Sequence, residues 1–255
     1  MKDRRENMKC ILLCAGYATR LFPLTKNFPK ALLEIEEGKP LLNYIVEEVN
    51  TIPEVDGIAL ITNERYAPHF TKWAEELHNE KPITVYNDHT TSNEDRLGAI
   101  GDIHYVINKA GIDDDVLIIA GDNLFTYPLK KVIEYYHTKN APVVCATEID
   151  DVNILRGFAV AELNEKDQIM NLIEKPQTPP TNIAVYATYV YPKEILDQIR
   201  HYLEEGNNPD APGYFVEYLY KKMPVYAYRF EGECYDVGTH EALDQVRKIY
   251  QKKLK

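Results

Sequence analysis

The chain has 255 residues, with 29 Lys and Arg against 40 Asp and Glu, and therefore a formal net charge of -11. Because non-specific nucleic-acid binding rests on neutralising backbone phosphates, this acidic balance argues against a nucleic-acid partner. The longest apolar runs, such as residues 116–120, are far shorter than the roughly 20 residues of a membrane helix, so no membrane partner is expected. Residues 1–7 are charged and lack the apolar region of a signal peptide, which predicts a cytoplasmic protein.

Short runs rich in Ile and Val alternate with longer amphipathic segments through the first half of the chain. This is the pattern of βα units around a mainly parallel sheet. We expect strands at residues 9–14, 57–62, 83–86, 116–120 and 142–149, and helices at residues 40–50, 64–79, 98–110 and 129–139. The first half is therefore predicted to be doubly wound.

The second half changes to strand-like segments with tight polar breaks, which suggest antiparallel additions to the same sheet. These segments are residues 157–163, 169–174 and 183–191, followed by a helix after Pro192, a loop at 206–213, a helix toward Lys222, a strand at 225–230 and a closing helix at 240–253 with Thr239 as its N-cap. The predicted fold class is α/β, with a Rossmann-like doubly wound, mixed but mainly parallel sheet. Without a convincing linker, we expect one domain over residues 1–255.

The chain offers no cysteine or histidine pattern typical of zinc. Cys10, Cys14, Cys145 and Cys234 form no CxxC pair, and the seven histidines form no HExxH arrangement. We expect reduced structural thiols and no histidine-based metal site.

Small residues follow the first predicted strand. Ala15, Gly16 and Ala18 let backbone amides come close to an anion, and consecutive amides at such a turn form a concave donor surface. Arg20 and Lys30 would add positive charge suited to a triphosphate. On small residues alone, a plain strand-to-helix turn with two surface cations explains the segment equally well.

Residues 13–25 and 28–33 together resemble LAAGxGTRLxPLTxxxPKxLL, the amino-terminal motif of the sugar-1-phosphate nucleotidyltransferases. The arginine, both prolines and the lysine stand at the family's spacing, so we expect residues 12–30 to cradle a triphosphate within a GT-A-like nucleotidyltransferase fold. The resemblance implies nucleoside contacts for Leu13, Ala15 and Gly16, β- and γ-phosphate binding for Arg20, and binding of the phosphates around the reacting centre for Lys30. Ala18 departs from the family's glycine and tolerates fewer backbone conformations.

Asp122 comes directly after a buried strand, where open α/β sheets place ligands. Residues 121–123 read GDN, which taken alone is more often a turn, but they resemble the family's GDN motif, which implies that Asp122 binds the nucleotide through Mg²⁺. Residues 234–239 resemble the family's WxDxGT motif, whose Asp, here Asp236, completes the metal site. Cys234 replaces the tryptophan, which lies near the acceptor pocket in family members, and this leaves the acceptor open.

Residues 174–176 resemble the family's EKP, which implies that Glu174 binds sugar hydroxyls and Lys175 the acceptor phosphate. Neighbouring side chains on a strand diverge, so the two roles require the strand to end there, as Pro176 suggests. Gly157 matches the glycine of the family's YG segment, where the backbone approaches the sugar. Val185 is a candidate wall of the acceptor pocket, although core packing explains it nearly as well, and nearby Ala187 replaces a family glycine.

Base recognition is expected in residues 89–98, aligned with the family loop that reads the nucleobase. Gly98 could allow close contact with the base while Asn93 or Arg96 hydrogen-bonds its edge; a polar loop without a ligand role is about as good a reading for any one of them.

The expected reaction transfers a nucleoside monophosphate from an NTP to a small phosphorylated acceptor, most simply a sugar-1-phosphate, and releases pyrophosphate. Residues of about 8–150 would form the nucleotide-binding half and residues of about 151–255 the acceptor-binding half. Arg20, Lys30 and Lys175 would act by alignment and charge neutralisation, with Mg²⁺ as cofactor. Family members often form dimers or tetramers, but the sequence leaves the assembly open, as it does the base and the acceptor.

Three other functions stay open at this point. A cytidylyltransferase acting on phosphocholine or another non-sugar phosphate shares the first motif and the acids, and the changes at Ala187 and Cys234 favour it somewhat. A glycosyltransferase would need a DxD-like metal motif, which residues 121–123 do not supply. A non-catalytic nucleotide-sensing protein would not need to retain all of the charged residues described above.

Overall fold

The computed structural model describes residues 7–253; residues 1–6, on which the cytoplasmic prediction partly rests, and residues 254–255 lie outside the described range. The strands are β1 (Met8–Leu13), β2 (Glu34–Glu36), β3 (Lys39–Pro40), β4 (Val55–Thr62), β5 (Ile83–Asn87), β6 (Asp115–Ala120), β7 (Asn123–Phe125), β8 (Val143–Glu148), β9 (Ala159–Leu163), β10 (Ile169–Glu174), β11 (Ile183–Tyr191), β12 (Tyr226–Arg229) and β13 (Cys234–Asp236). The α-helices are α1 (Leu41–Asn50), α2 (Ala67–Leu77), α3 (Ala99–Ala110), α4 (Leu129–Lys139), α5 (Val152–Leu155), α6 (Leu196–Glu204), α7 (Pro212–Leu219) and α8 (His240–Lys253). Short 3-10 helices cover Thr19–Leu21, Lys30–Leu32 and Lys193–Ile195.

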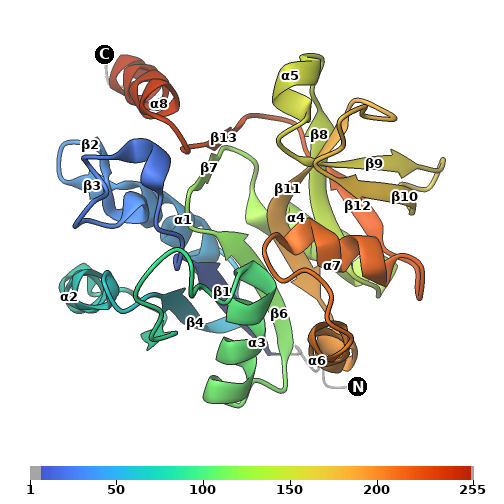
Figure 1. The fold of residues 1–255 in the computed structure, drawn as a ribbon, viewed down its shortest axis with the longest axis horizontal. Coiled ribbons are helices and arrows are strands. Elements are labelled where there is room, and N and C mark those ends of the chain that lie inside the picture. Colours follow the sequence, from blue (N-terminus) through green and yellow to red (C-terminus); the bar gives the residue numbers. More distant parts are fainter. Residues whose placement is uncertain (1–6, 254–255) are drawn as a thin grey trace.

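One nine-stranded sheet runs through both halves of the chain (Figure 1). Its main order is β10-β9-β11-β6-β1-β4-β5, and β8 pairs with β11 and with β12. The neighbours β5, β4, β1 and β6 are parallel, whereas β11 runs antiparallel to β6, β8 and β9, and β10 antiparallel to β9. The predicted mixed, mainly parallel α/β sheet and its antiparallel additions are therefore confirmed.

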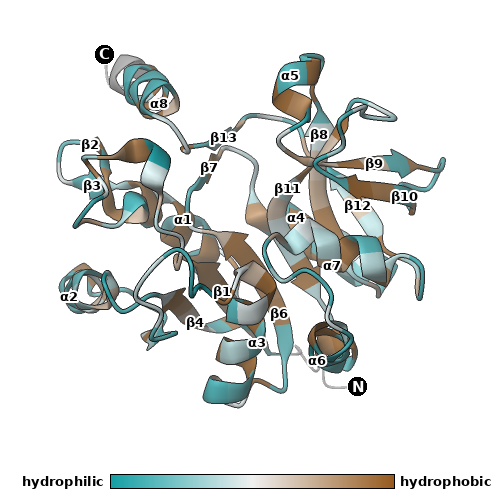
Figure 2. Ribbon diagram, viewed as in Figure 1, coloured by the Kyte–Doolittle hydropathy of each residue, from teal (hydrophilic) through white to brown (hydrophobic). Residues whose placement is uncertain are grey.

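Helices cover both faces of this sheet because its strands are apolar on both sides. In β1, Cys10 and Leu12 face one hydrophobic core, which includes residues of α1, α2, α4 and α8, and Ile11 faces the other, which includes residues of α3, α6 and α7. Alternate residues of a strand point to opposite faces, so each apolar strand contributes to both cores. The central strands are accordingly mostly hydrophobic along their length (Figure 2).

Most boundaries lie within three residues of the sequence prediction, and two helix starts have an identifiable cause. Helix α2 begins at Ala67 rather than at residue 64, because the side chain of Asn63 accepts a hydrogen bond from the amide of Tyr66 at 3.1 Å and ends the preceding turn. Helix α7 begins at Pro212, inside the predicted loop, because proline in the first turn needs no hydrogen-bond partner for its nitrogen. The predicted N-cap of α8 is confirmed, since the Thr239 hydroxyl accepts from the amide of Ala242 at 3.2 Å.

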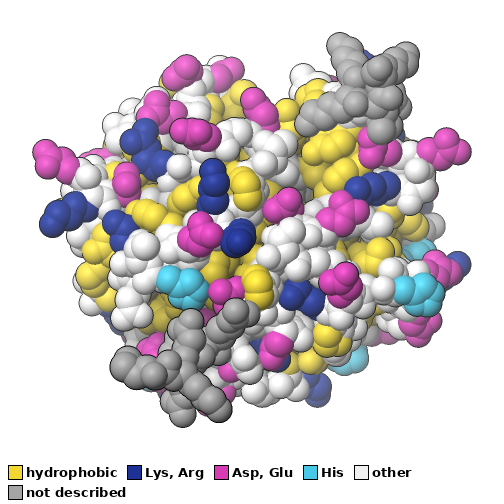
Figure 3. Space-filling view, turned by 180° about the vertical axis from the view of Figure 1, so that it is seen from behind, with side chains coloured by type: hydrophobic (Ala, Val, Ile, Leu, Met, Phe, Trp, Pro, Cys, Tyr) yellow, Lys and Arg dark blue, Asp and Glu magenta, His cyan; other side chains and the backbone are white. Residues whose placement is uncertain are grey.

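The surface carries both signs of charge side by side. On the face turned away from the view of Figure 1, acidic and basic side chains are interspersed (Figure 3). Among the described residues, no helix has the length and apolar character needed to cross a membrane. The parallel strands β1, β4, β5 and β6 end at one common edge, and the side chains of the candidate site gather there.

Candidate active site

A turn at residues 14–18 follows β1 and is fixed from behind by polar side chains of β4 and the start of α2. The Thr62 hydroxyl donates to the carbonyl of Cys14 at 3.2 Å, and the side-chain amide of Asn63 donates to the carbonyl of Ala15 at 2.8 Å. Thr62 and Asn63 are fully buried, so these bonds are shielded from water. The turn is therefore a rigid one.

The second half of the turn is held by Thr25 and Tyr66, which are also fully buried. The Thr25 hydroxyl donates to the carbonyl of Ala18 at 2.7 Å, and the Tyr66 hydroxyl lies 3.2 Å from the carbonyl oxygen of Tyr17 and 2.6 Å from that of Thr25. Ala18 itself has φ 47° and ψ 44°, a left-handed conformation that a glycine would adopt at no steric cost.

In this turn, the carbonyls of Cys14, Ala15, Tyr17 and Ala18 accept hydrogen bonds. Within residues 7–253, by contrast, the backbone amides of residues 15–18 donate to no protein acceptor. Successive free amides at the end of a strand form a surface that binds anions. The expectation of an anion-binding turn thus has a structural basis.

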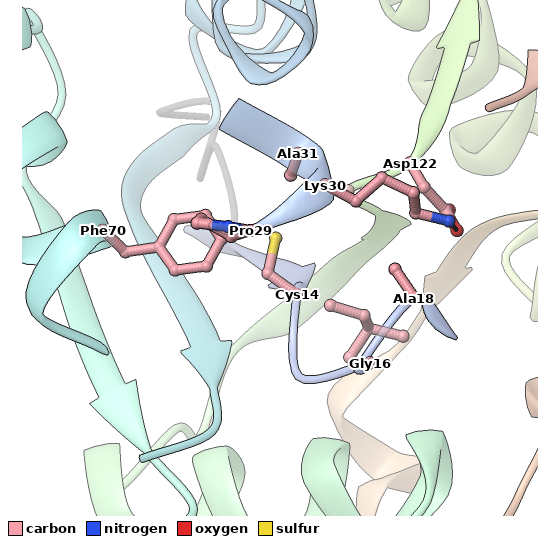
Figure 4. Close-up of a pocket in the computed structure, with 10 residues that line it drawn as sticks. Cys14, Gly16, Ala18, Pro29, Lys30, Ala31, Phe70 and Asp122 are labelled. Atoms are coloured by element: carbon pink, nitrogen blue, oxygen red, sulfur yellow. Dashed lines mark hydrogen bonds and ion pairs between the residues drawn. The ribbon is translucent and has the colours of Figure 1, made fainter. Parts of the chain in front are cut away.

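A small cavity of about 70 Å³ opens between this turn, the 3-10 helix at Lys30 and the end of β6 (Figure 4). Leu13, Gly16, Lys30 and Asp122, four of the predicted nucleotide-binding residues, line it. Ala15 is buried beside it. Across the cavity, Nζ of Lys30 lies 2.5 Å from Oδ2 of Asp122, so a cation already occupies one side of this carboxylate.

Asp122 and Asp236 are brought together by the pairing of two short strands. In the ladder of β7 and β13, Asn123 pairs with Asp236, and the amide of Val237 donates to the carbonyl of Asp122 at 3.0 Å. The two acids are 114 positions apart in the chain, yet this ladder places them side by side at the edge of the sheet. Among the described residues, no group of three or more His, Cys, Asp or Glu side chains could hold a metal ion.

Arg20 lies on the outer side of the acid pair. A Cβ added at Gly238 would come within 3.0 Å of Nη2 of Arg20 and 3.2 Å of Oδ1 of Asp236, so the glycine leaves room for the guanidinium beside the carboxylate. Asp236 is solvent-exposed, but the walls around it restrict its hydration. This desolvation, followed by the negative charge of Asp122, raises the pKa of Asp236, whereas Lys30, Arg20 and Lys175 lower it.

A second cavity, of about 200 Å³, lies on the other side of Asp122. All four predicted acceptor-binding residues line it: Gly157, Glu174, Lys175 and Val185. Ala187, Tyr189, the segment 211–213, Asp122 and Asp236 also line it. Asp122 is therefore common to both cavities.

Glu174 and Lys175 reach the same cavity because the strand ends between them. Strand β10 stops at Glu174, and Lys175 has φ 48°, a left-handed conformation that turns its side chain back toward its neighbour. Nζ of Lys175 lies 3.6 Å from Oε1 of Glu174, so the two side chains converge where a continued strand would separate them. Burial raises the pKa of Glu174, and Lys175 lowers it.

The predicted base-recognition residues lie apart from both cavities. Asn93 is exposed, and its carbonyl accepts from Nη1 of Arg96 at 2.7 Å. Gly98 has φ 79°, and a Cβ there would come within 2.5 Å of the carbonyl oxygen of Pro209. The absence of a side chain at Gly98 is thus used for packing within the protein, and a contact with the base stays a prediction.

The sequence interpretation missed the residues that hold the turn: Thr25, Thr62, Asn63 and Tyr66. A signal for two of them existed, since Thr62 and Asn63 are polar residues directly after an apolar strand. Cys234 also differs from expectation. It does not line the second cavity, and burial and the nearby thiol of Cys145 raise its pKa.

The fold is that of known nucleotidyltransferases. A UDP-glucose pyrophosphorylase, solved in complex with UDP-glucose, matches with a TM-score of 0.82 over 97% of this chain and 99% of that one, at 23% identity. The chain belongs to the Nucleotidyl transferase family, whose model matches residues 9–253.

Two curated relatives carry names that refer to sugar phosphates. A putative mannose-1-phosphate guanyltransferase of Sulfolobus acidocaldarius is 31% identical over 91% of this chain, which spans 60% of the relative's length. A UTP–glucose-1-phosphate uridylyltransferase of Staphylococcus haemolyticus is 26% identical over 92% of this chain and 88% of its own.

Proposed function

We propose that this protein transfers a nucleoside monophosphate from an NTP to a sugar-1-phosphate, with Mg²⁺ as cofactor, and releases pyrophosphate. The observation that carries the proposal is the position of Asp122, which lines both the anion-binding cavity beside the turn and the cavity with Glu174 and Lys175. A donor triphosphate in one cavity and an acceptor phosphate in the other would meet at this residue. The names of the two relatives support a nucleotide and a sugar phosphate as substrates.

The residues present fit a magnesium ion. Asp122 and Asp236 offer carboxylate oxygens, the donors that Mg²⁺ prefers, and Asp122 already binds a cation in the form of the Lys30 ammonium. Two carboxylates without a third ligand suit an ion that takes its other ligands from water and substrate phosphates. Asp122 and Asp236 would hold Mg²⁺, which when bound neutralises charge on the phosphate oxygens.

The protein's own groups would align the two phosphates. An oxygen of the sugar phosphate attacks the α-phosphorus of the NTP; a new P–O bond forms, and the bond to the pyrophosphate oxygen breaks. A phosphate monoester is already anionic near neutral pH, so no general base is needed. Lys30 and Arg20 would stabilise the departing pyrophosphate, and Lys175 would hold the attacking phosphate, so that catalysis comes from positioning and charge neutralisation.

The second cavity suits a sugar better than phosphocholine. A quaternary ammonium is usually held by several aromatic faces, and the wall contains Phe158 and Tyr189 as its aromatic residues beside the cationic Lys175. Glu174, by contrast, is a carboxylate placed to accept hydrogen bonds from hydroxyl groups.

A substrate screen tests this proposal. The protein is incubated with Mg²⁺, each of ATP, CTP, GTP, UTP and dTTP, and each of glucose-1-phosphate, mannose-1-phosphate, N-acetylglucosamine-1-phosphate and phosphocholine, and pyrophosphate release is measured. We expect release with at least one sugar-1-phosphate, and loss of it when EDTA removes the metal. Turnover with phosphocholine alone, or full activity in EDTA, would contradict the proposal.

A further inference from the structure

One short segment, residues 209–213, contacts the predicted base loop at its first residues and the second cavity at its last. At the first end, the amide of Ile100 donates to the carbonyl of Pro209 at 2.9 Å, and the amide of Ala99 donates to the carbonyl of Asp210 at 3.2 Å. These amides belong to the first turn of α3, which starts directly after Gly98. The segment therefore supplies hydrogen-bond acceptors for the first amides of this helix.

Close packing reinforces these two hydrogen bonds. A Cβ at Gly98 would lie 2.5 Å from the carbonyl oxygen of Pro209 and 3.0 Å from Cα of Asp210, distances too short for any side chain. The backbones of the base loop and of the segment are in direct contact at this point. A shift of Gly98 must therefore displace Pro209, since close-packed backbones do not deform independently.

An ion pair joins the loop and the segment a second time. Nε and Nη2 of Arg96 donate to Oδ1 of Asp210 at 3.1 and 2.8 Å, while Nη1 of the same guanidinium donates to the carbonyl of Asn93 at 2.7 Å. The planar guanidinium thus links the middle of the base loop to the segment.

The other end of the segment forms part of the acceptor cavity. Ala211, Pro212 and Gly213 line it. A Cβ at Gly213 would come within 1.8 Å of Oε2 of Glu174 and 2.9 Å of Cβ of Ala159, so the backbone of the segment presses directly on the carboxylate expected to read the sugar. The side chain of Glu174 is only 5% exposed, which leaves it little room to move independently.

We propose that residues 209–213 couple the two substrate subsites, so that NTP at the base loop and sugar phosphate at Glu174 strengthen each other's binding, with Arg96 and Asp210 as positioning residues. This inference rests on the proposed function. The segment contains two prolines in five residues, which restricts its backbone and lets a displacement at one end reach the other. Because such coupling is reciprocal, each substrate must respond to a change made at the other's subsite.

The test exchanges one partner of the ion pair at a time. KM for each substrate is measured in Arg96→Gln, Asp210→Asn and the double variant. The substrates are either UTP with glucose-1-phosphate or GTP with mannose-1-phosphate, whichever pair the wild type turns over faster. We expect Arg96→Gln, a change on the donor side, to raise KM for the sugar phosphate by about three- to tenfold, and Asp210→Asn to raise KM for the NTP similarly. The double variant should be no worse than the worse single one, since both remove the same link.

The matched control is Arg200→Gln, which breaks an ion pair of similar exposure with Asp197 on α6 and should leave both KM values unchanged. Arg96→Lys keeps the charge but loses the planar guanidinium, so its KM for the sugar phosphate should lie between those of the wild type and Arg96→Gln. The coupling would be overturned if Arg96→Gln changed KM only for the NTP and Asp210→Asn changed KM only for the sugar phosphate. Additive effects on KM in the double variant would overturn it as well.

A readout without turnover separates this inference from the proposed function. If the wild type releases no pyrophosphate, the proposed function fails, and hydrogen exchange decides the coupling: UTP or GTP with Mg²⁺ should slow amide exchange in the peptide that contains residues 211–219 in the wild type, but not in Arg96→Gln. If the nucleotide slowed exchange equally in both proteins, or slowed it in neither, the coupling would be rejected.

Discussion

Asp122 is the residue at which the two cavities meet, and its position makes the sharpest residue-level test. Asp122→Ala should reduce pyrophosphate release by about 100-fold or more, since it removes one of the two carboxylates that would hold Mg²⁺ at the reacting phosphates, while leaving the melting temperature within a few degrees of wild type. The control is Asp113→Ala, an exposed acid near the opposite end of β6. Near-normal turnover in Asp122→Ala would contradict the site assignment.

Ala18 stores backbone strain in the phosphate turn. The left-handed conformation costs an L residue roughly 1–2 kcal/mol, a cost that glycine does not have. Glycine also makes the unfolded chain more flexible, which offsets part of this gain in stability. Ala18→Gly should therefore stabilise the protein by up to about 1 kcal/mol, and Ala18→Val should destabilise it, as measured by urea unfolding. His78→Gly, at another left-handed position after α2, should stabilise similarly without changing KM for the NTP.

Asp88 and Asp102 form a buried pair of acids, one directly before the base loop and one in the first turn of α3 after it. Burial, and then the neighbouring Asp88, raise the pKa of Asp102 to about 8, and burial raises that of Asp88. The folded protein therefore keeps a proton that the unfolded chain releases above about pH 4.

The sign of the pH dependence follows from this retained proton. Stability is greatest below the unfolded pKa and falls as pH rises toward about 8, by at most about 1.4 kcal/mol per pH unit for one proton. Asp102→Asn should flatten the loss of unfolding free energy between pH 5 and pH 8, whereas Asp113→Asn should not. An unchanged slope in Asp102→Asn would show that the pair holds no proton.

At the scale of elements, the start of α2 and the phosphate turn depend on one side chain. Asn63 accepts from the amide of Tyr66 and donates to the carbonyl of Ala15, both in buried surroundings. Asn63→Ala should cost about 1–3 kcal/mol of unfolding free energy, because it leaves the buried carbonyl of Ala15 without a partner and removes one of the two acceptors of the Tyr66 amide, and should also raise KM for the NTP.

The comparison for Asn63→Ala is Thr51→Ala, which removes an exposed hydroxyl bonded to the carbonyl of Glu48 after α1. That variant should cost less than about 1 kcal/mol and leave KM for the NTP unchanged. If Asn63→Ala lowered stability without changing KM, the turn would not bind the nucleotide.

At the scale of the whole molecule, the two halves of the chain interlock in one sheet. Strand β11, from the second half, lies between β6 and β8, which both come from the first half. A fragment of residues 1–150 would expose the edges of both strands and lose one side of its cores.

This interlocking predicts that the halves do not fold separately. The 1–150 fragment should lack a cooperative thermal transition and be digested by protease faster than the complete chain, whereas mixing with residues 151–255 should restore protection. A fragment that melts cooperatively on its own would contradict a single catalytic domain over residues 1–255, which stays a prediction.

The sequence by itself determined the order and type of the main helices and strands, because hydrophobic periodicity is a local property of each segment. It also predicted which residues gather at the edge of the sheet, since Leu13, Lys30 and Asp122 lie in short motifs that resemble those of the sugar-1-phosphate nucleotidyltransferases. Strands β7 and β13 escaped prediction, because three residues are too few for a pattern.

Only the tertiary structure decided how those residues meet. The pairing of β7 with β13 and the contact of Gly98 with Pro209 depend on backbone geometry that no local pattern contains. The same holds for Cys234, which the ladder places away from the acceptor cavity. Contacts between residues a hundred positions apart are set by the packing of whole elements, and for this reason the sequence named the groups of the site while the fold fixed their arrangement.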